Sequence, residues 1–433
     1  MNAMSTRGLA SIAVTVFLIT AAEQLQAGDI TLQVGITGNN SLEGLQDPVA
    51  VAQIPEVSEL LQAIADKPRS ADHIEQSLGD SKVDLALLVE LDLLKPWDGG
   101  YAISFNYLTL EDHHLLVTTL APFAESLARS YRDRWPEFES VFSAYDIESV
   151  DMGELAYAVI GAMSLDWDGL DLTADKNLRI TADNLRGDRD FLIWAKEQSS
   201  EINARELYWG SHNTVVDGIR FTTFGDHYSL PRLGLPDLLW STNNRVANID
   251  AAPRTLRVSV YKALAPYYQD DFLGDAGTML SAMREGALTI DSISRLTGIG
   301  KERTEAILTL LMELQYVKRD NDSYVLAAPY FSFADKPMID AARKLSWLLM
   351  DEWLELNYST VQANLDRLTA QKYGVPYPQL FTEIWHYLFG LTNKALVTSG
   401  HFADPYAEER VSKGMFPFVF SADLLELRTE LKH

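Results

Sequence analysis

The same succession of helix, turn and strand signals occurs twice in this chain. Ser70-Ala71-Asp72-His73-Ile74 matches Thr289-Ile290-Asp291-Ser292-Ile293, an offset of 219 in the numbering. Lys95 to Tyr101 then matches Lys318 to Tyr324 at an offset of 223, so the two copies differ by a short length of loop. A long-range repeat of this kind indicates one structural unit used more than once. We therefore expect the 433 residues to fold as two related halves.

The second copy shows its local structure clearly. Thr289 is suited to cap a short helix, and Gly298 and Gly300 allow a tight turn after it. Lys301 to Leu314 has apolar residues at helical spacing. Two β-rich pieces around Asp320-Asn321-Asp322 predict a hairpin.

Helix, turn, helix and hairpin is the winged-helix arrangement. Residues 274–327 resemble regulators of the multiple-antibiotic-resistance and arsenical-resistance types. The earlier copy follows the same plan, with Gly79 at the turn and Val83 to Leu94 as the second helix. The resemblance implies a fold, and a DNA-binding regulator is the function that it would imply. Because one fold serves many functions, the resemblance alone does not assign one.

Each copy continues into an amphipathic helix, beginning near Asp112 and near Asp335. The expected fold is mainly α with small β-wings (α+β), a tandem duplication of a winged-helix unit followed by helices and a short β region. The acidic segment 166–190 is expected to be an insertion. The expected divisions are a signal peptide (1–27), an N-terminal extension (28–53), a first repeat (54–242), a linker (243–269) and a second repeat (270–433).

Residues 1–27 have the parts of a secretory signal. Arg7 precedes an uncharged apolar run from Leu9 to Ala22, and small residues suited to cleavage stand at Ala22 and Ala27. The run is short for a membrane span. We expect a periplasmic or secreted protein with no membrane segment in its mature form, or a cytoplasmic one if residues 1–27 are not a signal. The chain has no cysteine, which excludes disulfides, thiolate nucleophiles and cysteine-type zinc sites.

Charge argues against nucleic-acid binding. The chain holds 61 acidic and 36 basic residues, a formal net charge of −25, whereas nucleic-acid binding requires basic side chains that neutralise phosphates. Residues 54–107 carry ten acidic and four basic residues, and residues 274–327 carry eight and six. The candidate nucleic-acid contacts are four residues at one edge of the second copy: Lys301, Arg303, Lys318 and Arg319.

One cluster could support a metal or acid/base site. His212, Asp217, Asp226 and His227 are close in sequence and combine imidazole with carboxylate, which suits zinc or general acid/base catalysis. Their spacing matches no metal motif. Three other groups have ordinary explanations: a capped helix start with exposed imidazoles (His113, His114), a solvated acidic loop (Asp166, Asp168, Asp171) and a buried core histidine (His386).

The sequence contains no phosphate-binding loop, dinucleotide fingerprint, nucleophile elbow or zinc-protease motif. The leading hypothesis is an exported, non-enzymatic protein that acts through a protein partner or a small ligand, with no cofactor and with a homodimer left open. The alternatives are a ligand-responsive DNA-binding regulator and a metal-dependent or acid/base enzyme centred on residues 212–227.

Overall fold

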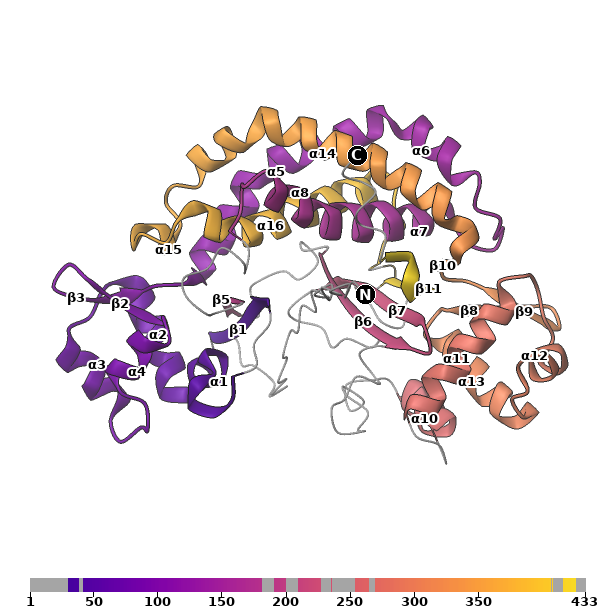
Figure 1. Cartoon of the computed structure of the whole chain (residues 1–433), viewed down its shortest axis with the longest axis horizontal. Helices are drawn as coiled ribbons and strands as arrows, with labels where there is room; N and C mark the ends of the chain where they lie inside the picture. The colour runs from indigo at the N-terminus through magenta and orange to yellow at the C-terminus, as the bar shows by residue number, and fades with distance from the viewer. Residues whose placement is uncertain are drawn as a thin grey trace, which may run out of the picture. The chain divides into compact units, whose positions relative to one another are not determined.

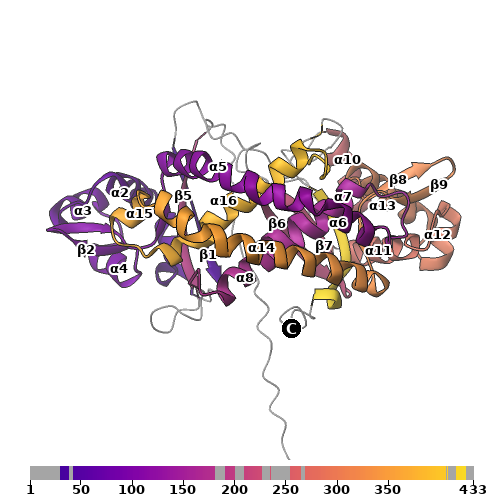
Figure 2. The ribbon, with the colours of Figure 1, turned by 90° about the horizontal axis from the view of Figure 1, so that it is seen from above.

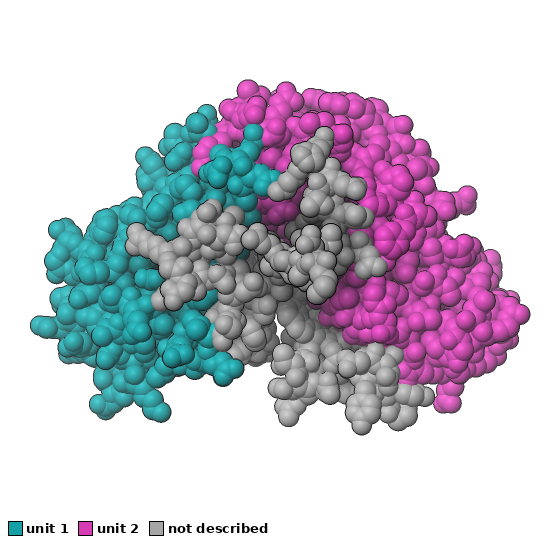
Figure 3. Space-filling view, in the orientation of Figure 1, with its two compact units in different colours: residues 1–119, 173–202, 359–384 teal, residues 120–172, 203–358, 385–433 magenta. Residues whose placement is uncertain are grey.

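The computed structural model describes residues 30–38, 42–180, 191–199, 209–226, 235, 254–264, 269–405, 407 and 416–425. Contacts divide the chain into two compact units (Figure 3). Unit 1 consists of residues 1–119, 173–202 and 359–384, and unit 2 consists of residues 120–172, 203–358 and 385–433. Neither unit is continuous in sequence, so the unit boundaries differ from the divisions that the sequence suggests.

The described residues are mainly helical and carry small sheets, as expected (Figure 1). The α-helices are α1 (Pro48–Ala52), α2 (Pro55–Asp66), α3 (Ala71–Leu78), α4 (Leu85–Glu90), α5 (Leu110–Asp133), α6 (Trp135–Phe142), α7 (Met152–Ala156), α8 (Gly169–Asp175), α10 (Arg254–Leu264), α11 (Gln269–Met283), α12 (Ile290–Thr297), α13 (Lys301–Glu313), α14 (Lys336–Asn364), α15 (Thr369–Lys372) and α16 (Tyr377–Thr398). A π-helical segment, η2 (Tyr157–Asp168), joins α7 to α8, and short 3₁₀ turns are η1 (Gly44–Gln46), η6 (Phe333–Asp335) and η7 (Ala422–Leu425).

The strands form two hairpins and two larger sheets among the described residues. They are β1 (Thr31–Gly38), β2 (Leu94–Trp97), β3 (Gly100–Ile103), β4 (Asn106–Leu108), β5 (Phe191–Gln198), β6 (Trp209–Val216), β7 (Ile219–Asp226), β8 (Val317–Asp320), β9 (Ser323–Leu326), β10 (Tyr330–Phe331) and β11 (Phe416–Ser421).

Unit 1 contains three helices and a hairpin, α2 to β3, which we call the first module (residues 55–103). The hydroxyl of Ser70 accepts a hydrogen bond from the amide of His73 and starts α3, and Gly79 ends it at a φ of 55°. Asp84 caps α4. The predicted helix from Val83 to Leu94 was too long, because Asp92 adopts a left-handed conformation (φ 55°) that turns the chain into β2.

Unit 2 also contains three helices and a hairpin, α11 to β9, which we call the second module (residues 269–326; Figure 2). The predicted cap is confirmed, because the hydroxyl of Thr289 accepts a hydrogen bond from the amide of Ser292 at 3.2 Å. Gly298 ends α12 at a φ of 75°. Helix α13 ends one residue before the predicted Leu314, and the predicted hairpin is present as β8 and β9.

The larger sheet of unit 1 has the order β1-β5-β4, with β5 antiparallel to β1 and parallel to β4. Val34 of β1 and Ile193 of β5 pack into the same apolar cluster as the first module. Gly35 stands opposite Trp194, and a Cβ atom at Gly35 would clash with that indole ring. Glycine is therefore the residue that fits this position.

The larger sheet of unit 2 has the order β10-β11-β7-β6. Strand β11 runs parallel to β10 and antiparallel to β7. The rings of Phe418 and Phe420 of β11 stack at 6.0 Å, and Trp167 lies 6.3 and 6.1 Å from them. These aromatic rings thus belong to a packed core.

Two expectations for the middle of the chain need correction. Asp166 and Asp168 were expected in a solvated acidic loop, but both are buried within η2. That segment 166–190 is an insertion stays a prediction, and residues 181–190 lie outside the described residues. Segment 243–269 was expected to be a linker, but residues 254–264 form α10, which packs into the apolar core of the second module, and α11 begins at residue 269. The expected signal, residues 1–27, also lies outside the described residues.

Candidate functional site

The two candidate nucleic-acid contacts on α13 both have acidic partners in unit 2. Lys301 pairs with Asp291 at 2.7 Å, and Arg303 pairs with Asp275. The Arg303 side chain is only 10% exposed. These basic groups are therefore partly neutralised where a recognition helix would meet phosphate.

The two candidates on the wing are also engaged. Lys318 donates to the carbonyl of Ser149 at 2.6 Å. Arg319 donates to the carbonyl of Asn321 at 2.8 Å, and its guanidinium lies 3.8 Å from the carboxylate of Asp322. A phosphate would have to compete with these contacts for all four basic residues.

The first module presents a strongly acidic surface. Its exposed carboxylates, which we call the acidic face, are Glu56, Glu59, Asp66, Asp72, Glu75, Asp80, Asp84, Glu90, Asp92 and Asp98. Two of the four basic residues in this stretch are held by the module itself: Arg69 donates to the carbonyl of Ala63 at 3.1 Å, and Lys95 lies 5.3 Å from the centre of the Trp97 ring. Because opposite charges attract, this surface favours a cationic partner.

A shallow, open hollow of about 450 Å³ lies beside the hairpin of the first module. It is lined by Ala71, Pro96, Trp97, Asp98, Gly99, Gly100 and Tyr101. The hollow combines aromatic surface with one carboxylate, and the ammonium of Lys95 already lies over its Trp97 ring. It is too open to enclose a small molecule on all sides.

The cluster at 212–227 is spread along the β6–β7 hairpin. Asp217 is exposed in the turn that joins the strands, whereas Asp226 is the last residue of β7. Strand β7 has 8 residues, so these two positions are separated by roughly 25 Å of extended chain. His212 pairs in register with Thr223, and His227 lies outside the described residues. The structure therefore does not bring Asp217 and Asp226 into one site.

A buried charged cluster that the sequence did not indicate lies in unit 1. Lys196 of β5 pairs with Glu383 of α16 at 2.5 Å, and its ammonium lies 4.9 Å from the centre of the Trp194 ring. His113 at the start of α5 is also buried, at 3% exposure. Burial, with the nearby positive charges of His114 and Lys196, lowers the pKa of His113 to about 4.

The side chains of His113 and His114 were both expected to be exposed. His114 is exposed, but His113 is buried. Nearby in unit 1, Tyr107 donates to Glu197 at 3.0 Å, and burial raises the pKa of both groups. Because Lys196, Glu383 and His113 are all buried, a solute has no direct access to them. The ion pair joins β5 to α16 inside unit 1.

The expected solvated acidic loop is instead part of a buried ion pair in unit 2. The guanidinium of Arg343 contacts the carboxylate of Asp168 through two nitrogen atoms. His386 was expected to be a buried core residue; it is half-buried on α16, with its ring 5.3 Å from that of Phe389. No sequence signal marks Arg343 as a partner, because it is 175 residues from Asp168.

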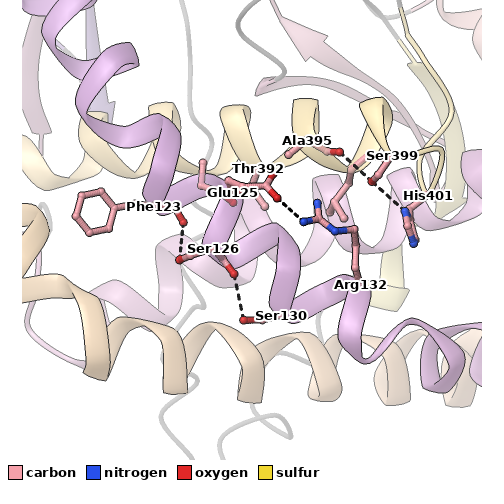
Figure 4. A network of polar contacts seen from close by, with 11 residues as sticks. Phe123, Glu125, Ser126, Ser130, Arg132, Thr392, Ala395, Ser399 and His401 are labelled. Carbon is pink, nitrogen blue, oxygen red and sulfur yellow. Dashed lines mark hydrogen bonds and ion pairs between the residues drawn. The ribbon is translucent and has the colours of Figure 1, made fainter.

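A polar network on α5 and near the end of α16 is shown in Figure 4. Ser126 donates to the carbonyl of Phe123, Ser130 donates to the carbonyl of Ser126, and Arg132 pairs with Glu125. His401 contacts the hydroxyl of Ser399 at 2.9 Å, and burial lowers its pKa. Most of these contacts join residues of one helix or one turn, so the network stabilises local structure.

Among the described residues, no group of three or more His, Asp or Glu side chains is arranged to hold a metal ion. No described helix is long and apolar enough to cross a membrane. The chain matches no protein-family model, and no curated protein or solved structure is significantly similar to it.

Proposed function

We propose that this is an exported, non-enzymatic binding protein with two winged-helix-containing halves, and that its first module binds a positively charged protein segment through the acidic face. The observation that carries the choice of partner is the charge of the first module. Ten exposed carboxylates stand on a stretch that has four basic residues, two of them held by the module itself. A surface of this kind attracts cations and repels phosphate.

Equivalent hydrogen bonds support the duplication. In the first module Arg69 pairs with Tyr101, and in the second module Leu288 pairs with Tyr324. These pairs keep the offsets of 219 and 223 found in the sequence. Each is an isolated bridge between the hairpin and the residue that precedes a helix cap, at the same place in both modules.

The helices that follow the modules begin in the same way. The amide of Thr109 donates to Asp112, whose own amide donates to the hydroxyl of Thr109. Ser332 and Asp335 form the equivalent capping box, again at the offset of 223. Reciprocal caps of this kind fix the start of a helix.

The larger sheets support repeat boundaries that differ from those the sequence suggests. In unit 1 the short strand β4 is parallel to β5, which is antiparallel to β1. In unit 2 the short strand β10 is parallel to β11, which is antiparallel to β7. We therefore propose a repeat that begins and ends with a strand, near residues 31–198 and 219–421, in place of 54–242 and 270–433.

DNA binding is less well supported. Lys301, Arg303 and Arg319 have acidic partners, and Lys318 is bound to a carbonyl group. In the first module the helix equivalent to a recognition helix, α4, has only 6 residues and is capped by the carboxylate of Asp84. All four candidate residues of the second module are thus already engaged, whereas phosphate contacts require available basic groups.

Binding can be tested with two labelled peptides, octalysine and octaglutamate, and the full-length protein. We expect octalysine to bind and octaglutamate not to bind, with an affinity for octalysine that falls as salt is added. The variant Asp72→Asn/Glu75→Gln/Asp80→Asn removes three exposed charges from the acidic face. It should weaken octalysine binding by about tenfold or more, as expected for loss of roughly 0.5 kcal/mol or more per charge.

The matched control is Glu285→Gln/Glu302→Gln/Glu305→Gln, which removes three exposed charges from the second module. It should leave octalysine binding within about twofold of the unmodified protein, which is a change of only ~0.4 kcal/mol. Equal weakening by both variants would show attraction by net charge alone and would exclude the acidic face as the site. Export is tested separately, by sequencing the amino terminus of the native protein: a retained residue 1 would contradict it.

A further inference from the structure

The segment that joins α6 to α7, residues 143–151, lies against the second module within unit 2. The hydroxyl of Tyr145 donates to the carbonyl of Tyr330 at 3.0 Å and accepts from the amide of Tyr330 at 2.9 Å. The hydroxyl of Ser149 donates to the carbonyl of Leu326 at 2.7 Å, and Ile147 packs against the apolar core of the module. We call this segment connector 1.

Charged groups reinforce the same contact. Arg284 bridges two carboxylates, Asp146 of connector 1 at 2.6 Å and Asp335 at 2.8 Å. Its guanidinium also lies 5.5 Å from the centre of the Tyr145 ring. Lys318 completes the set by donating to the carbonyl of Ser149. This lysine, which the sequence marked as a candidate DNA contact, therefore holds connector 1.

The segment that joins α14 to α16, residues 365–376, lies against the first module within unit 1. The hydroxyl of Tyr373 lies 3.1 and 3.0 Å from the carbonyls of Ala65 and Asp66, at the end of α2. Its ring meets the edge of Trp97, with 6.3 Å between ring centres. We call this segment connector 2.

The two connectors occupy corresponding places. The amide of Thr369 donates to Asp112 at 2.9 Å, and Asp112 is the acid that caps α5. Asp146 corresponds to Thr369 at the offset of 223, and it reaches the equivalent capping acid, Asp335, through Arg284. Connector 2 therefore contacts the cap of the helix that follows the first module, and connector 1 contacts the cap of the helix that follows the second module.

We divide the chain into a first half, residues 1–202, and a second half, residues 203–433. We infer that the second module is a docking surface for connector 1 of the first half, and that the first module is a docking surface for connector 2 of the second half. The two halves are therefore held together by exchange of their connectors. The composition of the units agrees with this: unit 1 takes residues 359–384 from the second half, and unit 2 takes residues 120–172 from the first. The inference rests on the connector contacts and does not depend on the cationic partner proposed above. The occupant of each surface is a second copy of the same structural unit, here fused into one chain.

The test uses the full-length chain with a site for a sequence-specific protease inserted between Ile202 and Asn203. After cleavage of the native protein, the two fragments should remain together at the mass of the intact chain, and should separate only when denaturant is added. Release of two separate folded fragments under native conditions would overturn the inference, because independently folded halves need no exchange.

A second measurement assigns the association to the connectors. In the cleaved protein, Tyr145→Phe and Tyr373→Phe should each raise the dissociation constant of the fragments about fivefold, the usual effect of losing one net hydrogen bond. The control is Tyr324→Phe, a buried tyrosine of β9 within the second module. No change in the two connector variants, or an equal change in the control, would exclude the connectors as the docking elements.

Discussion

The guanidinium of Arg343 and the carboxylate of Asp168 form a two-point ion pair inside unit 2. Nε lies 2.8 Å from Oδ2, and Nη2 lies 2.5 Å from Oδ1. Both side chains are almost completely buried, at 3% and 2% exposure. A pair of this kind is balanced as long as both charges are present, because each one offsets the desolvation cost of the other.

We predict that removing one member of this pair is much worse than removing both. Asp168→Leu should lower the free energy of unfolding by about 3–5 kcal/mol, because it leaves a buried guanidinium without its counter-charge. Asp168→Leu/Arg343→Met should recover most of that loss. Urea unfolding of the three proteins measures it, and a double variant as unstable as the single one would contradict the prediction.

The stability of the protein should depend on pH through His113. Its pKa is about 4 in the folded protein, below the ordinary value of about 6.5. The free energy of unfolding is therefore unaffected by His113 above about pH 6.5. It decreases as the pH falls toward 4, by about 3 kcal/mol in total, because the unfolded chain binds the proton first.

The measurement is chemical unfolding at a series of pH values for the unmodified protein and for His113→Leu. The variant should have a flatter profile between pH 6.5 and 4. His114→Leu, which changes the exposed neighbour, should keep most of the slope, since burial of His113 is the main cause of its lowered pKa. A slope that survives His113→Leu would assign the pH dependence to other groups.

Gly35→Ala should destabilise unit 1. The new Cβ atom would clash with the Trp194 ring, so the indole or the strand must move, at a cost of about 1–3 kcal/mol. The matched control is Gly35→Ala made in the Trp194→Phe background, because the smaller ring lacks the indole atoms that the added Cβ would meet. Thermal unfolding should show a lower midpoint for Gly35→Ala in the otherwise unmodified protein and a smaller drop when Gly35→Ala is added to Trp194→Phe; equal drops would mean that the indole ring is not the cause.

The helix caps of the two modules should contribute equally. Ser70→Ala and Thr289→Ala each remove an oxygen that accepts a helix amide, at a cost of about 1 kcal/mol. Ser70→Gly and Thr289→Gly should lower the free energy of unfolding by only about 0.3 kcal/mol, because glycine is also tolerated at the N-cap position. Urea unfolding measures these changes, and alanine variants as stable as the glycine ones would show that the caps are not needed.

The partners of Lys301, Arg303, Lys318 and Arg319 predict weak or absent DNA binding. At low salt, where electrostatic attraction is strongest, a gel-shift measurement with a mixed-sequence duplex should show no complex at micromolar protein. A complex that is lost on changing Lys301 and Arg319 to alanine would instead support the regulator hypothesis.

Local structure was predictable because it depends on residues near in sequence. The cap at Thr289, the turn at Gly298, helix α13 and the β8–β9 hairpin each follow from side chains within a few residues of the element. Helix α4 was predicted too long because the left-handed conformation of Asp92 leaves no strong signal in an apolar run.

The sites could not be predicted in the same way. Asp168 and Arg343 are 175 residues apart, and the sequence around Asp168 resembles an exposed acidic loop. Similarly, Asp217 and Asp226 are close in sequence, but Asp217 lies in the turn before β7 and Asp226 is the last residue of β7. Closeness in sequence is a poor guide here because an extended strand advances about 3.3 Å per residue.

The sequence by itself determined the net negative charge, the absence of cysteine, the hairpin after α13 and the positions of the helix caps at Ser70 and Thr289. Only the tertiary structure decided which charges are buried, which basic residues already have partners and which segments complete each compact unit. The physical reason is that caps and turns are stabilised by short-range hydrogen bonds, whereas burial and ion pairing depend on contacts between residues far apart in the chain.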